Sequence, residues 1–361
     1  MKICFFIGYY PLLKGGAEYQ AKLLATELNK ENEVFFISVG HDTDEILDLD
    51  GIKVYTLKIN RILDRAFLYY PTFRKIQNIL NREEPSLIYQ RVLDSFSFHL
   101  SKYVYEYKIP YYLHIADEYS LRFPSTLSGR VRYFFFKSII KTQVQFIVQT
   151  DNQKELLSYY GIKPILKIYN LHPDPDSKPS KESKDCVDKS ILWIGSARMV
   201  KRMEKYLDIA NSYKDFKSFK FYIIGRIEQG KYGDTLINRI KQMSNVIYLG
   251  ENENDYVNNM IVKSDILVNT SDSEGFSNTF IQAWLRGVPV VSLNSNPDGL
   301  MDKYELGYHC NGDMSMVTKC VYDLLHDNFT YNRISNNSYL IAKQLFSLDN
   351  NISQFKEILN H

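Results

Sequence analysis

The segment that most constrains this chain is residues 265–292, DILVNTSDSEGFSNTFIQAWLRGVPVVS. Its apolar start, 265–268, predicts a buried parallel strand, and the polar stretch 269–276 predicts a loop. A short helix is expected over 278–286, with apolar side chains spaced four residues apart, followed by another strand over 288–292. The segment therefore predicts a strand–loop–helix–strand unit of an open parallel sheet. Its polar residues fall at the strand end, where such sheets bind ligands.

The polar residues of this unit are placed to hold a phosphate between two other groups. Ser277, Asn278 and Thr279 form the first helical turn, where free backbone N–H groups and the helix dipole favour an anion. Glu274 precedes that turn and Gln282 follows it on the face of Asn278, so one is expected to reach a sugar and the other a ribose. A capped helix beside a solvated loop is the structural alternative. A polar helix start built from small residues in a buried sheet favours the ligand site.

Composition narrows the class of protein. The 361 residues are enough for two domains, and a hydrophobic content of 45% is ordinary for a soluble enzyme. The net charge of +2, without RNP, zinc-finger or helix-turn-helix spacings, gives no nucleic-acid signature. The four cysteines are scattered without a CxxC pair, which argues against a metal cluster or disulfide framework and suits a reducing cytoplasm. The first apolar run breaks at Pro11 and is interpreted as a strand rather than a signal peptide, and no window is long enough to span a membrane.

The first half of the chain has seven predicted strands alternating mainly with helices, which indicates a doubly wound sheet. Gly15 and Gly16 occupy the turn after the first strand, where glycine lets a backbone approach a ligand, although a plain tight turn is the default. His114 lies near the C-terminal end of the strand 111–115. A histidine there is either a hydrogen-bonded core residue or part of a site, and its place at the ligand edge of the sheet favours the site.

A helix expected over 128–141, SGRVRYFFFKSIIK, is both basic and aromatic. Arg130, Arg132, Lys137 and Lys141 surround four consecutive aromatic residues. Such a helix either buries its rings against the sheet and leaves its cations in solvent, or it lies on a membrane surface. The first interpretation is favoured.

Residues 171–189 hold three prolines and many polar residues, and they are interpreted as a linker. The second domain begins with a strand at Ile191, a glycine turn and three cations, Arg198, Lys201 and Arg202, before a helix. Cations beside a helix N-terminus suit a diphosphate. Surface cations near a turn are common, but three of them in one loop after a buried strand favour a binding site.

The sequence EGFSNTFIQAWLRGVPVV closely resembles the E-x7-E segment of retaining glycosyltransferase family 4, except that Gln282 occupies the second acidic position. The family pattern can be followed along nearly the whole chain. The resemblance implies the GT-B fold, an α/β architecture of two Rossmann-like doubly wound domains facing across a cleft. It implies an acceptor-binding domain over 1–170, a linker over 171–190, a nucleotide-sugar-binding domain over 191–345, and a helix over 346–361 that returns to the first domain.

The resemblance also implies roles for individual residues. Lys201 matches a lysine on the donor phosphates, whereas Arg198 lies two residues beyond the usual arginine position, which Ser196 occupies. His114 matches a histidine that contacts the donor sugar or diphosphate, and the end of the NVIYLG strand resembles the strand end that meets the base. The predicted site comprises Glu274, His114 and Lys201 as catalytic groups, with Gly15, Gly16, Arg198, Arg202, Gly275, Phe276, Ser277, Asn278, Thr279, Gln282, Leu249 and Gly250 as substrate-binding residues.

The activity that this resemblance implies is transfer of a hexosyl group from a UDP- or GDP-sugar to an acceptor hydroxyl, with retention at the anomeric carbon. The expected setting is polysaccharide or lipid-linked glycan synthesis, with a glycan or lipid-linked acceptor, in the cytoplasm or peripherally at the inner face of the membrane. No cofactor, metal or nucleic acid is expected. A metal is not needed because the cations can replace Mg²⁺, and the Asp-x-Asp triplets lie elsewhere, in an early loop region and the linker. Two alternatives are a nucleotide-sugar epimerase, with Asp117 and Glu118 as its acid–base candidates, and a nucleotide-sugar-binding protein that lost activity, which Gln282 gives reason to consider.

Overall fold

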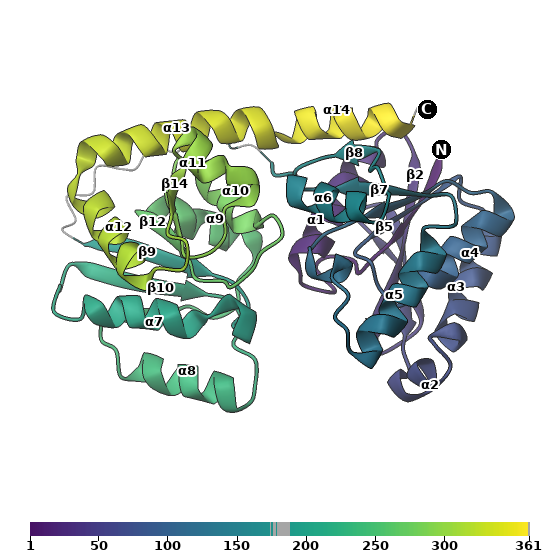
Figure 1. Cartoon of the computed structure of the whole chain (residues 1–361), viewed down its shortest axis with the longest axis horizontal. Coiled ribbons are helices and arrows are strands. Elements are labelled where there is room, and N and C mark those ends of the chain that lie inside the picture. Colours follow the sequence, from purple (N-terminus) through teal and green to yellow (C-terminus); the bar gives the residue numbers. More distant parts are fainter. Residues whose placement is uncertain (174, 176–177, 179–187, 360–361) are drawn as a thin grey trace. The chain divides into compact units, whose positions relative to one another are not determined.

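The computed structural model describes residues 1–173, 175, 178 and 188–359. The chain divides into two compact units. Unit 1 is Met1–Leu171 together with the segment that starts at Asn351, and unit 2 is His172–Asn350 (Figure 1). Most of the predicted linker, and Cys186 within it, lies outside the described residues. Each unit is described by itself.

Unit 1 is built on an eight-stranded sheet of order β3-β4-β2-β1-β5-β6-β7-β8. Seven of its strands run parallel, as the strand–helix alternation predicted. The strands are β1 (Lys2–Phe6), β2 (Glu33–His41), β3 (Glu45–Leu49), β4 (Ile52–Lys58), β5 (Leu87–Arg91), β6 (Tyr111–His114), β7 (Val144–Val148) and β8 (Leu166–Lys167).

The eighth strand corrects the sequence analysis, which placed this region in a loop. Strand β3 pairs antiparallel with β4 through a tight turn in which Asp50 and Gly51 both have positive φ, 56° and 73°. Asp-Gly is the dipeptide that such hairpin turns favour. Strand β3 lies at the sheet edge and contains no buried residue, so it lacks the apolar run on which the prediction relied.

The helices of unit 1 cover both faces of this sheet because strand side chains alternate between them. Cys4 and Phe6 of β1 share one hydrophobic cluster with residues of α3, α4 and α5. Figure 1 shows these three helices together on one side of the sheet. The helices of the unit are α1 (Gly16–Leu28), α2 (Arg61–Ala66), α3 (Tyr70–Glu83), α4 (Ser97–Tyr107), α5 (Leu127–Ile139), α6 (Asp151–Tyr159) and the 3-10 turn η1 (Tyr119–Leu121).

The last helix, α14 (Leu348–Leu359), packs on the other face of the same sheet. Phe355 is 1% exposed, and its ring centroid lies 5.6 Å from that of Tyr89 and 6.4 Å from that of Tyr112. The Tyr112 hydroxyl donates to the Ile358 carbonyl at 2.7 Å. Helix α14 therefore packs into the core of unit 1.

Unit 2 has a fully parallel six-stranded sheet of order β11-β10-β9-β12-β13-β14. Its strands are β9 (Lys189–Ile194), β10 (Phe219–Ile224), β11 (Val246–Tyr248), β12 (Ile266–Asn269), β13 (Val290–Ser292) and β14 (Gly307–His309). Its helices are η2 (Met199–Lys201), α7 (Met203–Ser212), α8 (Lys231–Lys241), α9 (Asn254–Lys263), α10 (Asn278–Trp284), η3 (Pro297–Gly299), α11 (Leu300–Tyr304), α12 (Met314–His326) and α13 (Asn328–Phe346).

Each sheet reverses its strand order at one place. In unit 2 the chain runs outward from β9 to β11 and then returns to place β12 beside β9. In unit 1 the corresponding reversal lies between β1 and β5. Loops that follow the two strands at such a point diverge, and ligands of open parallel sheets bind in the crevice that they leave. The predicted fold class, two parallel-sheet Rossmann-like units, is confirmed.

Within the part of the chain that the structure describes, no helix is long and apolar enough to cross a bilayer.

Removing the Phe355 ring should destabilise unit 1, because the cavity would open under β5 and β6. We expect Phe355→Ala to lower the free energy of unfolding by about 3 kcal/mol or more, as measured by thermal denaturation. Hydrogen exchange should quicken at the Tyr89 and Tyr112 amides. Glu357→Ala, an exposed change on the same helix, is the control and should shift stability by less than ~0.5 kcal/mol. Equal, small effects of the two changes would contradict the docking of α14.

Candidate functional site

A partly buried ion pair occupies the reversal point of unit 2. Lys201 ends the 3-10 turn after β9, and its Nζ lies 2.6 Å from both carboxylate oxygens of Glu274, in the loop after β12. The side chains are 20% and 11% exposed. Asn269 Nδ2 and Ser271 Oγ also donate to Glu274 Oε1, at 3.0 and 2.6 Å. Two predicted catalytic groups, 73 residues apart in sequence, are thus in direct contact.

The surroundings of Glu274 keep it ionised. Burial alone would raise its pKa, but the charge and hydrogen bonds of Lys201, with those of Ser271 and Asn269, outweigh burial and lower the pKa below its usual value of 4.5. A lowered pKa means that the carboxylate stabilises the fold above about pH 4.5, and that this stabilisation is lost as pH falls through the folded-state pKa. At neutral pH the site therefore presents one anion and one cation side by side.

Hydrogen bonds fix the two loops to each other. Thr270 Oγ1 donates to the Lys201 carbonyl at 3.0 Å and accepts from Trp193 Nε1 at 3.0 Å. The Asp272 amide donates to the Val200 carbonyl at 2.8 Å. Because Trp193 is 2% exposed in the unit 2 core, these bonds tie the ion pair to the sheet itself.

The two predicted arginines differ in their surroundings. The Arg198 side chain is exposed, and the structure gives it no carboxylate partner among the described residues. Arg202, in a left-handed conformation with φ 51°, lies 3.0 Å from Glu204 and 3.5 Å from Asp272 through its Nε. Arg198 is therefore the freer cation, and Arg202 is already neutralised by two carboxylates.

Helix α10 is shorter than the sequence analysis expected, seven residues ending at Trp284. Ser277 is its N-cap residue, and the hydroxyls of Ser277 and Thr279 lie 2.9 Å apart. Phe276 is buried and contacts Phe346 edge-on at 5.3 Å between ring centroids. Phe280 and Trp284 form the predicted i,i+4 pair, with ring centroids 5.5 Å apart.

Gln282 was expected on the face of Asn278, away from the apolar side, and α9 covers its side chain there, leaving it 3% exposed. Its Nε2 donates to Asn258 at 3.1 Å and Asn254 at 3.4 Å, both on α9. The structure gives its Oε1 no donor among the residues it describes. The amide is thus held by one end, which leaves an oxygen to accept a hydrogen bond.

Glycines end three neighbouring strands of unit 2 at the same edge. Gly225 follows β10 and its amide donates to the Gly250 carbonyl, after β11, at 2.8 Å. A Cβ on Gly225, where φ is +135°, would lie 2.0 Å from the Gly195 carbonyl oxygen after β9. Leu249 N donates to the Ile223 carbonyl at 2.9 Å, and no atom lies within 4 Å of a Cβ built on Gly250. The space beside Gly250 is therefore open for a ligand that approaches the backbone.

In unit 1 the predicted glycine turn sits at the start of α1, but a carboxylate lies over it. Gly15 is the N-cap residue, and a Cβ there would be 2.0 Å from Glu18 Oε2. Burial raises the pKa of Glu18, against opposing effects of its own backbone amide and of Arg91. The N-terminus of α1 is thus already complemented by the protein's own acid. A diphosphate beside Gly15 and Gly16 would have to move or protonate Glu18.

His114 lies at the end of β6 in a buried polar cluster. Its Nδ1 is 2.8 Å from the Tyr89 hydroxyl and 3.2 Å from Arg91 Nη1. A guanidinium only donates, so Nδ1 accepts and Nε2 carries the ring proton. Burial and the nearby Arg91 charge hold the pKa of His114 well below 6.5, so the ring is neutral at pH 7. Its Nε2 has no partner within the described residues, which leaves a buried N–H available to a ligand oxygen.

The sequence analysis missed Arg91, which orients His114 and donates to Asn170 Oδ1 at 2.5 Å through Nη2. The available signal was a charged residue at the end of a strand, followed by Asp94 in the next loop. Asp117 and Glu118, the acid–base candidates for an epimerase, serve local structure. Asp117 accepts from the Ser120 amide at 2.7 Å, and Glu118 pairs with Arg122 at 3.5 Å.

Comparison with solved structures identifies the fold of this chain. Sucrose-phosphate synthase from Thermosynechococcus elongatus superposes with a TM-score of 0.77 at 13% identity, over 99% of this chain and 98% of that chain. HepE of Anabaena, in complex with UDP and glucose, superposes with a TM-score of 0.76 at 18% identity, over 100% of this chain and 99% of that chain. The fold is GT-B, as predicted.

The sequence comparisons are more specific. Residues 188–327, which contain Lys201 and Glu274, match the family model of glycosyl transferases group 1. An uncharacterized glycosyltransferase of Methanocaldococcus jannaschii is 24% identical over 317 residues, 81% of this chain and 80% of that protein. These matches support a glycosyltransferase.

Replacing Lys201 should leave the largely buried Glu274 carboxylate without a compensating charge. We expect Lys201→Met to lower the free energy of unfolding by about 3 kcal/mol at pH 7. The double variant with Glu274→Gln should recover at least half of the loss. Lys214→Met, an exposed control in the same unit, should have little effect.

The pH dependence provides a second check on this ion pair. Without Lys201, burial raises the pKa of Glu274, so the deficit of Lys201→Met should shrink as pH falls from 7 to 5. Additive single changes, or a deficit independent of pH, would contradict the energetic coupling.

Proposed function

We propose that this protein is a retaining glycosyltransferase that moves a hexosyl group from a UDP- or GDP-sugar to an acceptor hydroxyl in polysaccharide or lipid-linked glycan synthesis. The observation that carries the proposal is the Lys201–Glu274 pair at the reversal point of unit 2, inside the matched region. The similarity to HepE, which was solved with UDP and with UDP-glucose, supports a UDP-sugar donor.

In this proposal each residue of the ion pair leaves the other to bind a group of the donor. Lys201 leaves Glu274 for the donor diphosphate, and Arg198 adds the second cation to the leaving group. Glu274, still held through one oxygen by Ser271 and Asn269, turns its other oxygen to the sugar hydroxyls. A carboxylate preorganised beside the reacting carbon stabilises positive charge on the ring in the transition state.

The remaining donor contacts follow from the loops around the pair. Gln282 Oε1 accepts from a ribose hydroxyl, and backbone groups at Leu249 and Gly250 meet the base. Arg202 supports the loop through its carboxylate partners rather than binding phosphate directly. The diphosphate lies against the segment made up of Gly275, Phe276, Ser277, Asn278 and Thr279.

The bond changes balance without a protein base. The bond between the anomeric carbon and the diphosphate oxygen breaks, and the acceptor oxygen bonds to the same face of that carbon. The acceptor proton passes to the departing diphosphate oxygen. Lys201 and Arg198 stabilise the charge that develops on that leaving group.

Unit 1 supplies the acceptor side in this proposal. His114, neutral with its proton on Nε2, donates to a sugar oxygen of the ligand. In this proposal Glu18 moves off the start of α1 to admit the ligand beside Gly15 and Gly16. The proposed location is the cytoplasm, with peripheral membrane contact through the exposed side chains of Leu127, Phe134 and the neighbouring cations of α5.

Substitutions of Glu274 and of Gln282 should have different effects on the kinetics of transfer. Glu274→Gln removes the charge nearest the reacting ring and should lower kcat on the order of 10²–10³-fold. Gln282→Ala removes a ribose contact and should raise the donor KM several-fold with kcat nearly unchanged. Gln282→Glu should be tolerated, because its neighbours Asn254 and Asn258 can donate to it by rotating their amides.

Steady-state kinetics with a UDP- or GDP-sugar separate these outcomes. Near-normal turnover of Glu274→Gln, together with loss of kcat in Gln282→Ala, would reverse the assignment of sugar and ribose ends. A wild-type protein that binds nucleotide sugar but transfers to no acceptor would leave only a binding function.

Transfer should persist in EDTA, because Lys201 and Arg198 neutralise the diphosphate. Two of the early acidic residues have other partners, since Asp44 pairs with Lys75 at 2.6 Å and Asp50 with Lys22 at 2.8 Å. The measurement is initial rate after dialysis against EDTA, with a matched sample to which Mg²⁺ is returned. Loss of rate in EDTA with recovery in Mg²⁺ would overturn metal independence.

A further inference from the structure

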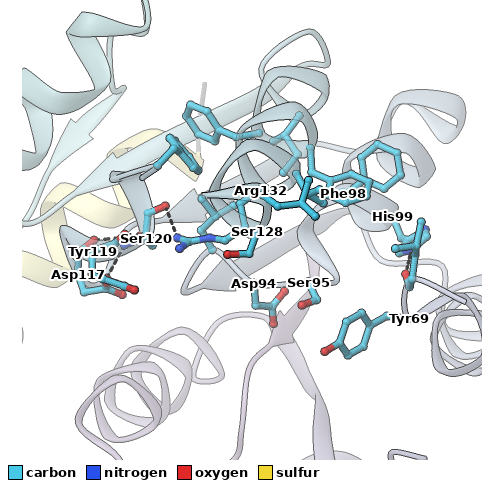
Figure 2. Close-up of a pocket in the computed structure, with 18 residues that line it drawn as sticks. Tyr69, Asp94, Ser95, Phe98, His99, Asp117, Tyr119, Ser120, Ser128 and Arg132 are labelled. Carbon is cyan, nitrogen blue, oxygen red and sulfur yellow. Dashed lines mark hydrogen bonds between the residues drawn. The ribbon is translucent and has the colours of Figure 1, made fainter. Parts of the chain in front are cut away.

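An open pocket of about 730 Å³ lies in unit 1 between α4 and α5 (Figure 2). Its volume falls in the range of roughly 300–1,000 Å³ that small-ligand sites occupy. Loops after β5 and β6 close one end of it, and the start of α5 forms part of its mouth. None of its lining residues belongs to the predicted donor site.

Apolar side chains line the pocket from floor to mouth, beside polar lining residues that include Asp117 and Arg132. Phe136 and Ile139 are buried at 1% and 2% exposure, and Phe98, Phe123 and Phe135 also line it. At the mouth the lining side chains are largely exposed, with Leu68 at 54%, Leu127 at 81% and Val131 at 44%. An apolar surface that continues from a buried floor onto an exposed rim suits a flexible hydrocarbon chain longer than the cavity itself.

Asp94, one of the two carboxylate residues in the lining, is held by a single oxygen. Asp94 Oδ1 accepts from Gln90 Nε2 at 2.9 Å, from the Phe96 amide at 2.8 Å, and from the amide and hydroxyl of Ser97 at 3.2 and 3.3 Å. The structure gives Asp94 Oδ2 no donor in the described part of the chain. Figure 2 shows this carboxylate between the side chains of Ser128 and Ser95 in that view. It is one of several polar groups in the lining, which also includes Ser95, Ser128 and Arg132.

The position of Asp94 is also specific. It follows β5, so it lies at the reversal point of the unit 1 sheet, where ligands of open parallel sheets bind. Arg91 and His114 end β5 and its neighbour β6 at the same edge. The pocket thus joins an apolar space to the edge of the sheet that carries the polar groups of unit 1.

We propose that this pocket binds the hydrocarbon chain of an amphiphilic acceptor and that Asp94 Oδ2 accepts a hydrogen bond from the hydroxyl-bearing head group. This rests on the proposed function for the identity of the ligand as an acceptor. The acceptor class is then an alcohol or glycoside with an aliphatic tail, rather than a fully polar glycan.

Binding of simple amphiphiles to the full chain tests the pocket without any donor. Calorimetric titration with methyl, butyl and octyl β-D-glucoside, each below its critical micelle concentration, should show affinity rising with chain length. Each buried methylene should add roughly fourfold, so octyl glucoside should bind at least about 100-fold more tightly than methyl glucoside. Equal affinities for the three glucosides would overturn the proposal.

Two substitutions on α5 form a matched pair. Val131→Glu places a charge at the pocket mouth and should abolish the chain-length dependence. Phe134→Glu, at a residue that is 66% exposed and outside the lining, should leave it unchanged. If both changes abolish binding, or if the protein binds phosphatidylcholine vesicles but no monomeric glucoside, α5 adsorbs to lipid surfaces and the pocket proposal is wrong.

Asp94→Asn tests the polar contact, because the amide keeps Oδ1 for the backbone and replaces Oδ2 by a donor. Octyl glucoside should then bind about tenfold more weakly or worse while the chain-length dependence remains. Unchanged affinity would remove Asp94 from the proposal.

Transfer assays separate the pocket proposal from the proposed function. Transfer to polar acceptors without any chain-length effect would contradict only the pocket proposal. Chain-length-dependent binding without transfer from any donor would contradict only the proposed function.

Discussion

The contact between Lys201 and Glu274 depends on two loops that are far apart in sequence and adjacent in the sheet. It forms because β12 returns beside β9, and because Thr270 and Trp193 bind the loops to the sheet core. An ion pair with limited exposure is stable only when its remaining hydrogen-bonding groups have partners. Here Ser271 and Asn269 donate to the Glu274 carboxylate. In the proposed function this pair separates when a diphosphate offers Lys201 a second anion.

The two units use the same sheet geometry for different chemistry. In unit 2 the reversal point gathers charge, with a cation and an anion in contact and a freer Arg198 nearby. In unit 1 it gathers hydrogen-bonding groups of fixed direction, the neutral His114 and the carboxylate of Asp94, beside an apolar pocket. This contrast fits a donor whose binding is dominated by phosphate charge and an acceptor recognised by a hydroxyl and an apolar tail.

Features coded by local patterns were predictable from the sequence. The strand–loop–helix–strand unit was correctly anticipated because apolar strands, the i,i+4 pair and Gly287 are local signals. Strand β3 was missed because an exposed edge strand has no apolar run. The Lys201–Glu274 contact and the role of Arg91 were not predicted because they arise from tertiary pairing. The burial of Gln282 was not predicted because packing of α9 against α10, rather than helical periodicity alone, decides it.

The central claim is that the Lys201–Glu274 pair opens to receive a nucleotide diphosphate, and a crystal structure of the protein with UDP tests it most directly. The account predicts a diphosphate oxygen within about 3 Å of Lys201 Nζ, with at least one Glu274 oxygen released from the lysine. It also predicts that Gln282 Oε1 accepts from a ribose hydroxyl. UDP bound away from the loops after β9 and β12, with the ion pair intact, would contradict it.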